Sequence, residues 1–301
     1  MPQRTRTYQN HHIDSLRWDH FKPRNDDIVI ATPYKSGTTW MQGIVGSLIL
    51  PEEKDPTKGK ASPWIDNRAR PIDEVINDLE EQTHRRFIKT HLPLDGLIYY
   101  PQIKYIVVGR DARDVFMSLW NHYRSYTPFS YERFNNTPGR VGDPFPACPN
   151  DIRAFWQMWI ARGWFEWESE GYPFWSNFRH VQTWWDFRNL DNILLVHYGD
   201  LLQDPGGEIQ RVAEYLEIEV SEERLNNIVD ATRFDKMRQV AIGREKQAGG
   251  PQGRGARSHF YKGTNGRWKG VLTEDDLKLY EVTVERELSP DCTYWLEHGR
   301  H

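Results

Sequence analysis

The stretch ATPYKSGTTWMQGIV, Ala31–Val45, decides the fold because it joins a predicted strand to a predicted helix through a short polar turn. The run DDIVIAT at residues 26–32 is rich in β-branched side chains and predicts a buried strand that stops at Pro33. From residue 38 to residue 50 the apolar side chains follow helical spacing. Backbone N–H groups at the start of such a helix, together with the helix dipole, favour an anion in the turn.

The turn carries side chains that suit an anion, but in an unusual order. A Walker-type phosphate loop reads G-x-x-x-x-G-K-S/T, whereas here Lys35 precedes Gly37 and no glycine opens the loop. A cation, a glycine and several hydroxyl groups still coincide within a few residues. The simpler alternative is a plain strand-to-helix turn with polar caps. The coincidence of these residues favours an anion-binding turn over that alternative.

Alternating strands and helices continue along the chain. Apolar strands are predicted at residues 86–91, 104–109 and 192–198, and helices at residues 71–82 and 111–123. This alternation predicts an α/β fold with a mostly parallel central sheet flanked by helices, and sites at the carboxyl ends of the strands. We expect one domain over residues 1–301, with its core at about 26–290.

Two regions depart from this alternation. Residues 127–150 are rich in proline and glycine and are predicted to form an irregular excursion. Residues 241–270 hold seven arginines and lysines against one acid and many glycines, which predicts a local basic loop. Because the second region ends in the ordered-looking sequence FYKGTNGRWKG, we favour a binding role over a purely solvated loop.

Composition narrows the class of protein. The 301 residues carry a formal net charge of −4, so the overall charge does not indicate a nucleic-acid-binding protein. No apolar run approaches the ~18 residues that a membrane span needs, and no signal peptide is visible. Two distant cysteines, Cys148 and Cys292, do not make a disulfide framework, which favours the cytoplasm. The 13 tryptophans exceed ordinary usage and suit an apolar ligand pocket as well as a core.

Polar side chains at two further strand ends should meet the first turn. Arg110 directly follows the predicted strand 104–109, and Ser118 lies about two helical turns later on the same face. Lys89 and His91 stand two residues apart at the end of another strand, so both point to one side. Arginine offers a planar fork to a phosphate, and histidine can accept a proton near neutral pH. Solvated arginines and a structural histidine are the plainer alternatives.

Five segments together resemble the cytosolic-type sulfotransferases, and they are most similar to the bacterial aryl and glycolipid-type members of that family. They are PYKSGTTW, KTHLP, GRDARDVFMS, ILLVHYGDL and KGTNGRWK, in the order of that family. The resemblance implies the donor 3′-phosphoadenosine 5′-phosphosulfate, the product adenosine 3′,5′-bisphosphate, no metal, and a small hydroxylated acceptor that is phenolic, alcoholic or lipid-like. It does not name the acceptor or the oligomeric state.

The resemblance also implies how the donor is held. The 5′ side would be bound by Lys35, Ser36, Gly37, Thr38 and Thr39. The 3′-phosphate would be bound by Arg110 and Ser118, with help from Lys262 and Gly263. The adenine would lie among Trp40, Tyr198, Thr232 and Phe234.

The catalytic residues implied by the resemblance are His91, Lys35, Lys89 and Ser118. His91 would take the proton of the acceptor hydroxyl, and we expect its free base to titrate in the mildly acidic to neutral range. Lys35 and Lys89 would stabilise charge on the bridging and leaving oxygens.

One phosphate ligand departs from the family pattern. Many members carry Arg-Lys-Gly before the closing Gly-x-Trp-Lys segment, and this chain has Tyr261-Lys262-Gly263. We expect Arg257 and Lys262 to supply the missing positive charge.

Two other functions remain open on the residues alone. A small-molecule or nucleotide kinase would need Mg²⁺ for its phosphates. A nucleotide-binding protein without activity would keep the pocket but not depend on His91. Candidates for the acceptor wall are the aromatic side chains of residues 155–185, with Phe129 and Phe145, and no single one stands out.

Overall fold

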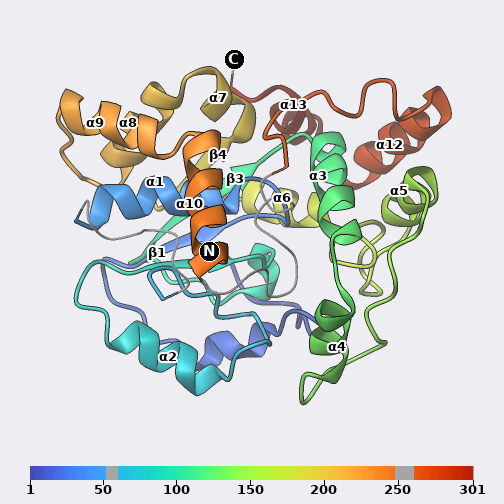
Figure 1. The fold of residues 1–301 in the computed structure, drawn as a ribbon, viewed down its shortest axis with the longest axis horizontal. Coiled ribbons are helices and arrows are strands. Elements are labelled where there is room, and N and C mark those ends of the chain that lie inside the picture. The colour runs from blue at the N-terminus through green and yellow to red at the C-terminus, as the bar shows by residue number, and fades with distance from the viewer. Residues whose placement is uncertain (52–59, 248–260, 301) are drawn as a thin grey trace.

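A four-stranded parallel sheet forms the centre of the computed structural model, which describes residues 1–51, 60–247 and 261–300 (Figure 1). The strands are β1 (Ile28–Ala31), β2 (Phe87–Thr90), β3 (Lys104–Gly109) and β4 (Ile193–His197). Their order across the sheet is β2-β1-β3-β4, and every neighbouring pair is parallel. All four carboxyl ends therefore meet at one edge, as predicted from the strand–helix alternation.

Both faces of the sheet are buried, which explains why its strands read as continuous apolar runs. In β1, Val29 and Ala31 belong to one hydrophobic core, and Ile28 and Ile30 belong to the other. The alternation of side chains along the strand thus divides a uniformly apolar sequence between two cores.

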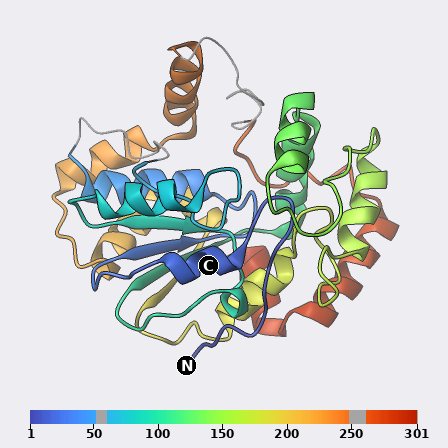
Figure 2. The same cartoon turned by 90° about the horizontal axis from the view of Figure 1, so that it is seen from below.

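Helices cover each face of the sheet (Figure 1). The core of Ile28 and Ile30 is completed by α1 (Thr38–Ile49), α7 (Tyr198–Gln203), α8 (Pro205–Tyr215) and α9 (Glu222–Ala231). The other core takes side chains from α3 (Ala112–Arg124), α5 (Ile152–Ala161), α6 (Asn177–Trp185), α12 (Glu274–Glu287) and α13 (Pro290–His298). The remaining elements are η1 (Ser15–His20), α2 (Ile72–Glu80), η2 (Leu94–Gly96), α4 (Pro128–Asn136) and α10 (Phe234–Gln247). Figure 2 shows α10 standing out from these layers.

The predicted strands and the first helices are confirmed to within a few residues, but both irregular regions contain helix. Within residues 127–150 lies α4, which begins at Pro128 behind a capping box formed by Thr127 and Ser130. Within residues 241–270, the part up to Gln247 continues α10. The proline and glycine content concealed α4, because a local cap can start a helix in such a sequence. Helix α10 instead begins at Phe234, before the second region, and extends into it.

Helix α13 braces the carboxyl ends of β3 and β4. A β-carbon at Gly109 would lie 2.4 Å from the ring of Trp295, so only glycine admits this close approach. At the end of β4, the Nε2 atom of His197 lies 3.0 Å from the carbonyl oxygen of Leu296. One helix thus packs against the ends of both strands, at Gly109 and at His197.

The structure also bears on two expectations drawn from composition. No helix in the described part of the chain is long and apolar enough to cross a membrane. Cys148 and Cys292 are both free thiols.

Candidate active site

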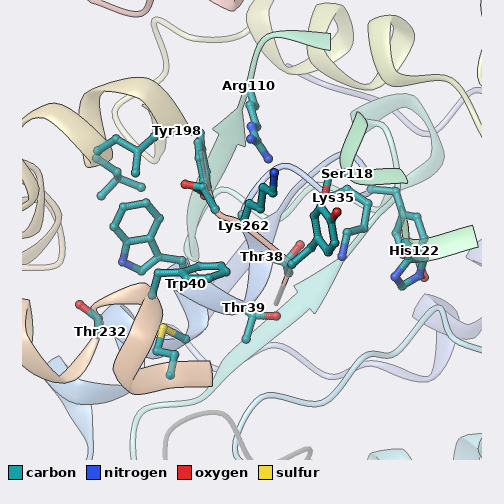
Figure 3. Close-up of a pocket in the computed structure, with 18 of the residues that line it drawn as sticks. Lys35, Thr38, Thr39, Trp40, Arg110, Ser118, His122, Tyr198, Thr232 and Lys262 are labelled. Atoms are coloured by element: carbon teal, nitrogen blue, oxygen red, sulfur yellow. Dashed lines mark hydrogen bonds between the residues drawn. The ribbon is translucent and has the colours of Figure 1, made fainter. Parts of the chain in front are cut away.

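A cavity of about 330 Å³ lies at the carboxyl edge of the sheet (Figure 3). Its walls come from the turn after β1, the ends of β2 and β3, helix α3, the start of α7, residues 229–237 and residues 261–267. These segments are far apart in the sequence and meet here because parallel strands end at the same edge. The cavity therefore occupies the place where the sequence predicted a site.

The turn after β1 is shaped to leave room beside the start of α1. Lys35 and Gly37 both adopt positive φ angles, of 70° and 112°. A β-carbon at Gly37 would lie 2.9 Å from the Tyr198 ring, so the turn requires glycine there for space as well as for backbone geometry. Within the described residues, α1 begins behind Gly37 without a side-chain cap, so its first backbone N–H groups can donate to a ligand.

Most side chains of this turn line the cavity. Lys35, Thr38, Thr39 and Trp40 lie in its wall together with Gly37. The side chain of Ser36 is instead fully buried and is not part of the wall. Any contact between a ligand and Ser36 would therefore involve the backbone.

His91 is buried in the cavity wall and is held in one tautomer. Its Nδ1 atom lies 2.8 Å from the carbonyl oxygen of Thr32. A carbonyl can only accept, so Nδ1 carries the proton and Nε2 is left as the acceptor. The rings of Trp64 and Tyr34 meet the imidazole edge-on, with centroids at 4.8 and 5.0 Å. The geometry thus presents an oriented, neutral imidazole.

Burial, and next the positive charge of Lys89, hold the pKa of His91 well below its ordinary value of 6.5. This differs from the mildly acidic to neutral range expected from the sequence, because the strand-end position is enclosed by aromatic rings rather than open to water. The imidazole is accordingly neutral, and able to accept a proton, throughout the neutral range.

A buried carboxylate supports this part of the site, and sequence reasoning missed it. Asp66 accepts hydrogen bonds from the indole N–H of Trp64 at 2.6 Å and from the backbone N–H of His91 at 3.3 Å. The Lys89 ammonium lies over the Trp64 ring, 4.7 Å from its centroid. Asp66 therefore fixes the ring against which both Lys89 and His91 are placed.

A second polar pair also escaped the sequence analysis. The Tyr34 hydroxyl and the Nε2 atom of His122 share a hydrogen bond of 3.0 Å, and both residues line the cavity near His91. The sequence did hold a signal, since His122 follows Ser118 by four residues and so lies on the same helix face. Figure 3 shows His122 and Lys35 at the end of the cavity away from Trp40.

The part of the cavity wall around Arg110 is also cationic. The guanidinium of Arg110 stacks over the Tyr198 ring at 4.1 Å from its centroid. It donates to the Asn265 side chain and to the Thr264 carbonyl oxygen, both at 3.0 Å. Ser118, Lys262 and Gly263 line the cavity as well. Arg110 is thus oriented by stacking and by two hydrogen bonds.

Aromatic and apolar side chains occupy the remaining wall. Trp40 and Tyr198 meet edge to face with ring centroids 5.4 Å apart. Thr232 and Phe234 lie in the same wall, so all four residues predicted around an adenine are brought together. Arg257, predicted to contribute positive charge, lies outside the described residues.

The described residues also bear on the predicted absence of a metal. Within residues 1–51, 60–247 and 261–300, no group of three or more His, Cys, Asp or Glu side chains is arranged to hold a metal ion.

Taken together, the parallel sheet, the uncapped helix start and the cationic, aromatic cavity define an α/β protein whose cavity suits an anionic, nucleotide-like ligand. A family model described as a sulfotransferase domain matches residues 25–290. The chain therefore belongs to the sulfotransferase family.

Individual relatives agree with this assignment. The glycolipid sulfotransferase of Mycobacterium tuberculosis (strain ATCC 25177 / H37Ra) is 31% identical, over 97% of this chain and 94% of that protein. Sulfotransferase 1A1 of Rattus norvegicus is 27% identical, over 89% and 86%. Among solved structures, mouse sulfotransferase SULT7A1 complexed with PAP matches with a TM-score of 0.68 at 20% identity, covering 93% of this chain and 90% of that one.

Proposed function

We propose that this sulfotransferase moves a sulfuryl group from 3′-phosphoadenosine 5′-phosphosulfate to the hydroxyl of a small phenolic, alcoholic or lipid-like acceptor, with His91 as the base. The observation that carries the proposal is the hydrogen bond between His91 Nδ1 and the Thr32 carbonyl oxygen, at 2.8 Å. It leaves Nε2 as a proton acceptor in a wall shared with Lys35 and Lys89.

The cavity suits the two charged ends and the aromatic middle of this donor. Lys35 and the open start of α1 offer a cation and N–H donors to the 5′-phosphosulfate. Arg110, Ser118 and Lys262 offer charged and hydroxyl groups to the 3′-phosphate. Aromatic side chains between them provide faces and edges for the adenine. The mouse relative's complex with PAP supports the same ligand class for this chain.

The chemistry follows from these positions. His91 Nε2 accepts the acceptor's proton while the hydroxyl oxygen forms a bond to sulfur. The bond between sulfur and the bridging oxygen of the 5′-phosphate breaks, and adenosine 3′,5′-bisphosphate leaves with that oxygen. Lys35 and Lys89 stabilise the negative charge that develops on the leaving and transferred oxygens. Positioning and preorganised charge are the main catalytic resources for such a transfer.

The acceptor would lie where the wall changes from cationic to aromatic. Tyr34, Trp64 and His91 line this part, and Phe174 and Trp175 pack behind the Tyr34 ring. Such a wall suits a hydroxyl carried on a ring or chain. The mycobacterial relatives named glycolipid sulfotransferases support a lipid-like or sugar-bearing acceptor. Phe129 is exposed and Phe145 is buried, and neither lines the cavity.

The proposal is tested by incubating the purified protein with donor and a panel of phenols, alcohols and glycolipids, and measuring the mass added by a sulfo group. We expect transfer in the presence of EDTA. Mg²⁺-dependent transfer from ATP, with none from the sulfate donor, would instead establish the kinase alternative, which the family match does not favour.

The His91→Ala variant separates an enzyme from a protein that only binds nucleotide. We expect this variant to bind adenosine 3′,5′-bisphosphate with unchanged affinity and to lose most turnover. Binding by both proteins with turnover in neither would point to the non-catalytic alternative.

A further inference from the structure

Arg267 lies in the wall of the cavity, although the sequence pattern did not point to it as a ligand-binding residue. It is half-buried, and its guanidinium lies over the Tyr261 ring, 4.8 Å from the ring centroid. Within residues 1–51, 60–247 and 261–300, no carboxylate lies within 4.0 Å of this guanidinium. Among those residues the charge therefore has no close ion pair, and the carboxylate of Asp114 acts on it only from a longer distance.

Arg267 also shares its part of the cavity with other cations. Arg110 and Lys262 line the same cavity, and the positive charge of Arg110 acts unfavourably on that of Arg267. Gathering like charges costs free energy when the site is empty, and an anion bound between them removes that cost. Burial, with Arg110 as a further contributor, lowers the pKa of Arg267, though an arginine remains protonated at neutral pH.

The backbone of Arg267 is fixed relative to Arg110. The carboxylate of Asp114, in the first turn of α3, accepts the N–H groups of Gly266 at 2.8 Å and Arg267 at 3.1 Å. Arg110 precedes Asp111, the N-cap residue of α3, and in turn donates to Asn265 at 3.0 Å. The two arginines thus belong to one hydrogen-bonded unit, and their separation does not depend on a long unsupported loop.

We propose that Arg267 binds the 3′-phosphate of the donor and supplies the charge that many sulfotransferases take from an arginine at the position of Tyr261. The Tyr261 ring serves as the surface on which the guanidinium is stacked. This inference rests on the proposed function, because it takes the end of the cavity near Arg110 as the 3′-phosphate end. It deepens that function by naming the side chain that replaces the family arginine.

Titration calorimetry with two nucleotides tests the assignment. Adenosine 3′,5′-bisphosphate carries the 3′-phosphate, and adenosine 5′-monophosphate lacks it. Since a charge-assisted hydrogen bond contributes about 1.5–3 kcal/mol, Arg267→Gln should weaken bisphosphate binding by roughly 10- to 100-fold. The monophosphate should bind with nearly unchanged affinity. The matched control is Lys269→Gln, which removes an exposed charge two residues away and outside the cavity wall.

A relocated charge gives a second measurement. In the Arg267→Gln background, Tyr261→Arg should restore part of the bisphosphate affinity, because it returns an arginine to the family position. Arg267→Lys keeps the charge but not the fork, so an intermediate loss is expected and covers the case in which Arg267→Gln fails to fold.

Two results would overturn the assignment. One is unchanged bisphosphate affinity in Arg267→Gln, and the other is an equal loss for both nucleotides. Failure of the wild-type protein to bind the bisphosphate at all would instead refute the proposed function, so the two failures are distinguishable.

Discussion

The Nδ1 atom of His91 and the carbonyl oxygen of Thr32 lie 2.8 Å apart, across the boundary between two neighbouring strands. The distance follows from the register of the sheet, in which Ala31 of β1 lies opposite Thr90 of β2. Thr32 directly follows β1, and His91 directly follows β2. The orientation of the imidazole is therefore set by strand pairing rather than by a flexible loop.

The first prediction concerns the pH dependence of kcat/KM. His91 acts as a base in its neutral form, so activity is present above its pKa and falls as the pH drops through that value. Burial and Lys89 hold this pKa well below 6.5, so the profile should stay flat as the pH falls from 8 to the ordinary histidine range. A high-pKa alcohol is the proper acceptor, because an ionised phenol needs no base.

The matched variant for this measurement is His91→Ala. It should lose roughly 10²- to 10⁴-fold in turnover and lose the acidic limb as well. An acidic limb centred at the ordinary histidine value in the wild-type protein, or one that persists in the variant, would contradict the assigned base.

The second prediction concerns Tyr34 and His122. Tyr34→Phe removes the hydroxyl that bonds to His122 but keeps the ring beside His91. We expect KM to rise several-fold for acceptors with a second hydroxyl group, such as catechol, and to stay unchanged for phenol, because a hydrogen bond contributes about 0.5–1.5 kcal/mol. Steady-state kinetics with both acceptors gives the measurement.

Two controls accompany the Tyr34 variant. His122→Phe should give a similar loss, and the double variant should lose less than the sum of the two single effects. A fall in affinity for adenosine 3′,5′-bisphosphate in Tyr34→Phe would place this pair on the donor side and contradict the prediction.

The third prediction concerns the carboxylate of Asp66. Asp66→Asn keeps the size of the side chain but turns an amide N–H₂ toward groups that already donate, among them the indoles of Trp64 and Trp18. We expect a loss of about 1–3 kcal/mol in the free energy of unfolding, measured with urea, and a lower kcat. Asp73→Asn on the exposed side of α2 is the control and should be neutral. Equal stability of the two variants would show that Asp66 does not organise this wall.

The fourth prediction concerns two buried carboxyl groups before α6. Burial raises the pKa of Glu168 to about 8 and that of Glu170 to about 7. The folded state then binds more protons than the unfolded state, so these groups favour folding at low pH and that contribution is lost as the pH rises from about 4.5 through 8. Glu168→Gln cannot ionise, so its Tm should fall less between pH 6 and pH 9 than that of the wild type.

The adjacent exposed residue gives the comparison for that measurement. Glu166→Gln removes a charge from the surface two positions away and should keep the wild-type pH dependence. Identical curves for Glu168→Gln and Glu166→Gln would refute the role of burial.

The sequence predicted those parts of the site that depend on local pattern and on parallel pairing. Lys35, Lys89, His91 and Arg110 all stand at strand ends, and one rule about parallel sheets brings them together. The contacts of Asp66 and of the pair Tyr34 and His122 arise between separate segments with no shared periodicity. Helical spacing could place His122 on the face of Ser118, but it could not bring His122 to Tyr34. The role of Arg267 needed the observed position of its guanidinium over a neighbouring ring.

The brace that α13 provides has a consequence for the order in which the protein is made. Trp295 and Leu296 leave the ribosome long after the strands they hold, whereas Arg110 and Tyr198 directly follow those strands. The nascent chain can thus form the first strand, turn and helix early. The ends of β3 and β4, which carry Arg110 and Tyr198, lack the packing of α13 until that helix emerges. We expect stalled chains that stop before Pro290 to show little retention on immobilised nucleotide, and released chains that include α13 to be retained. Maturation of the donor site therefore follows the synthesis of α13.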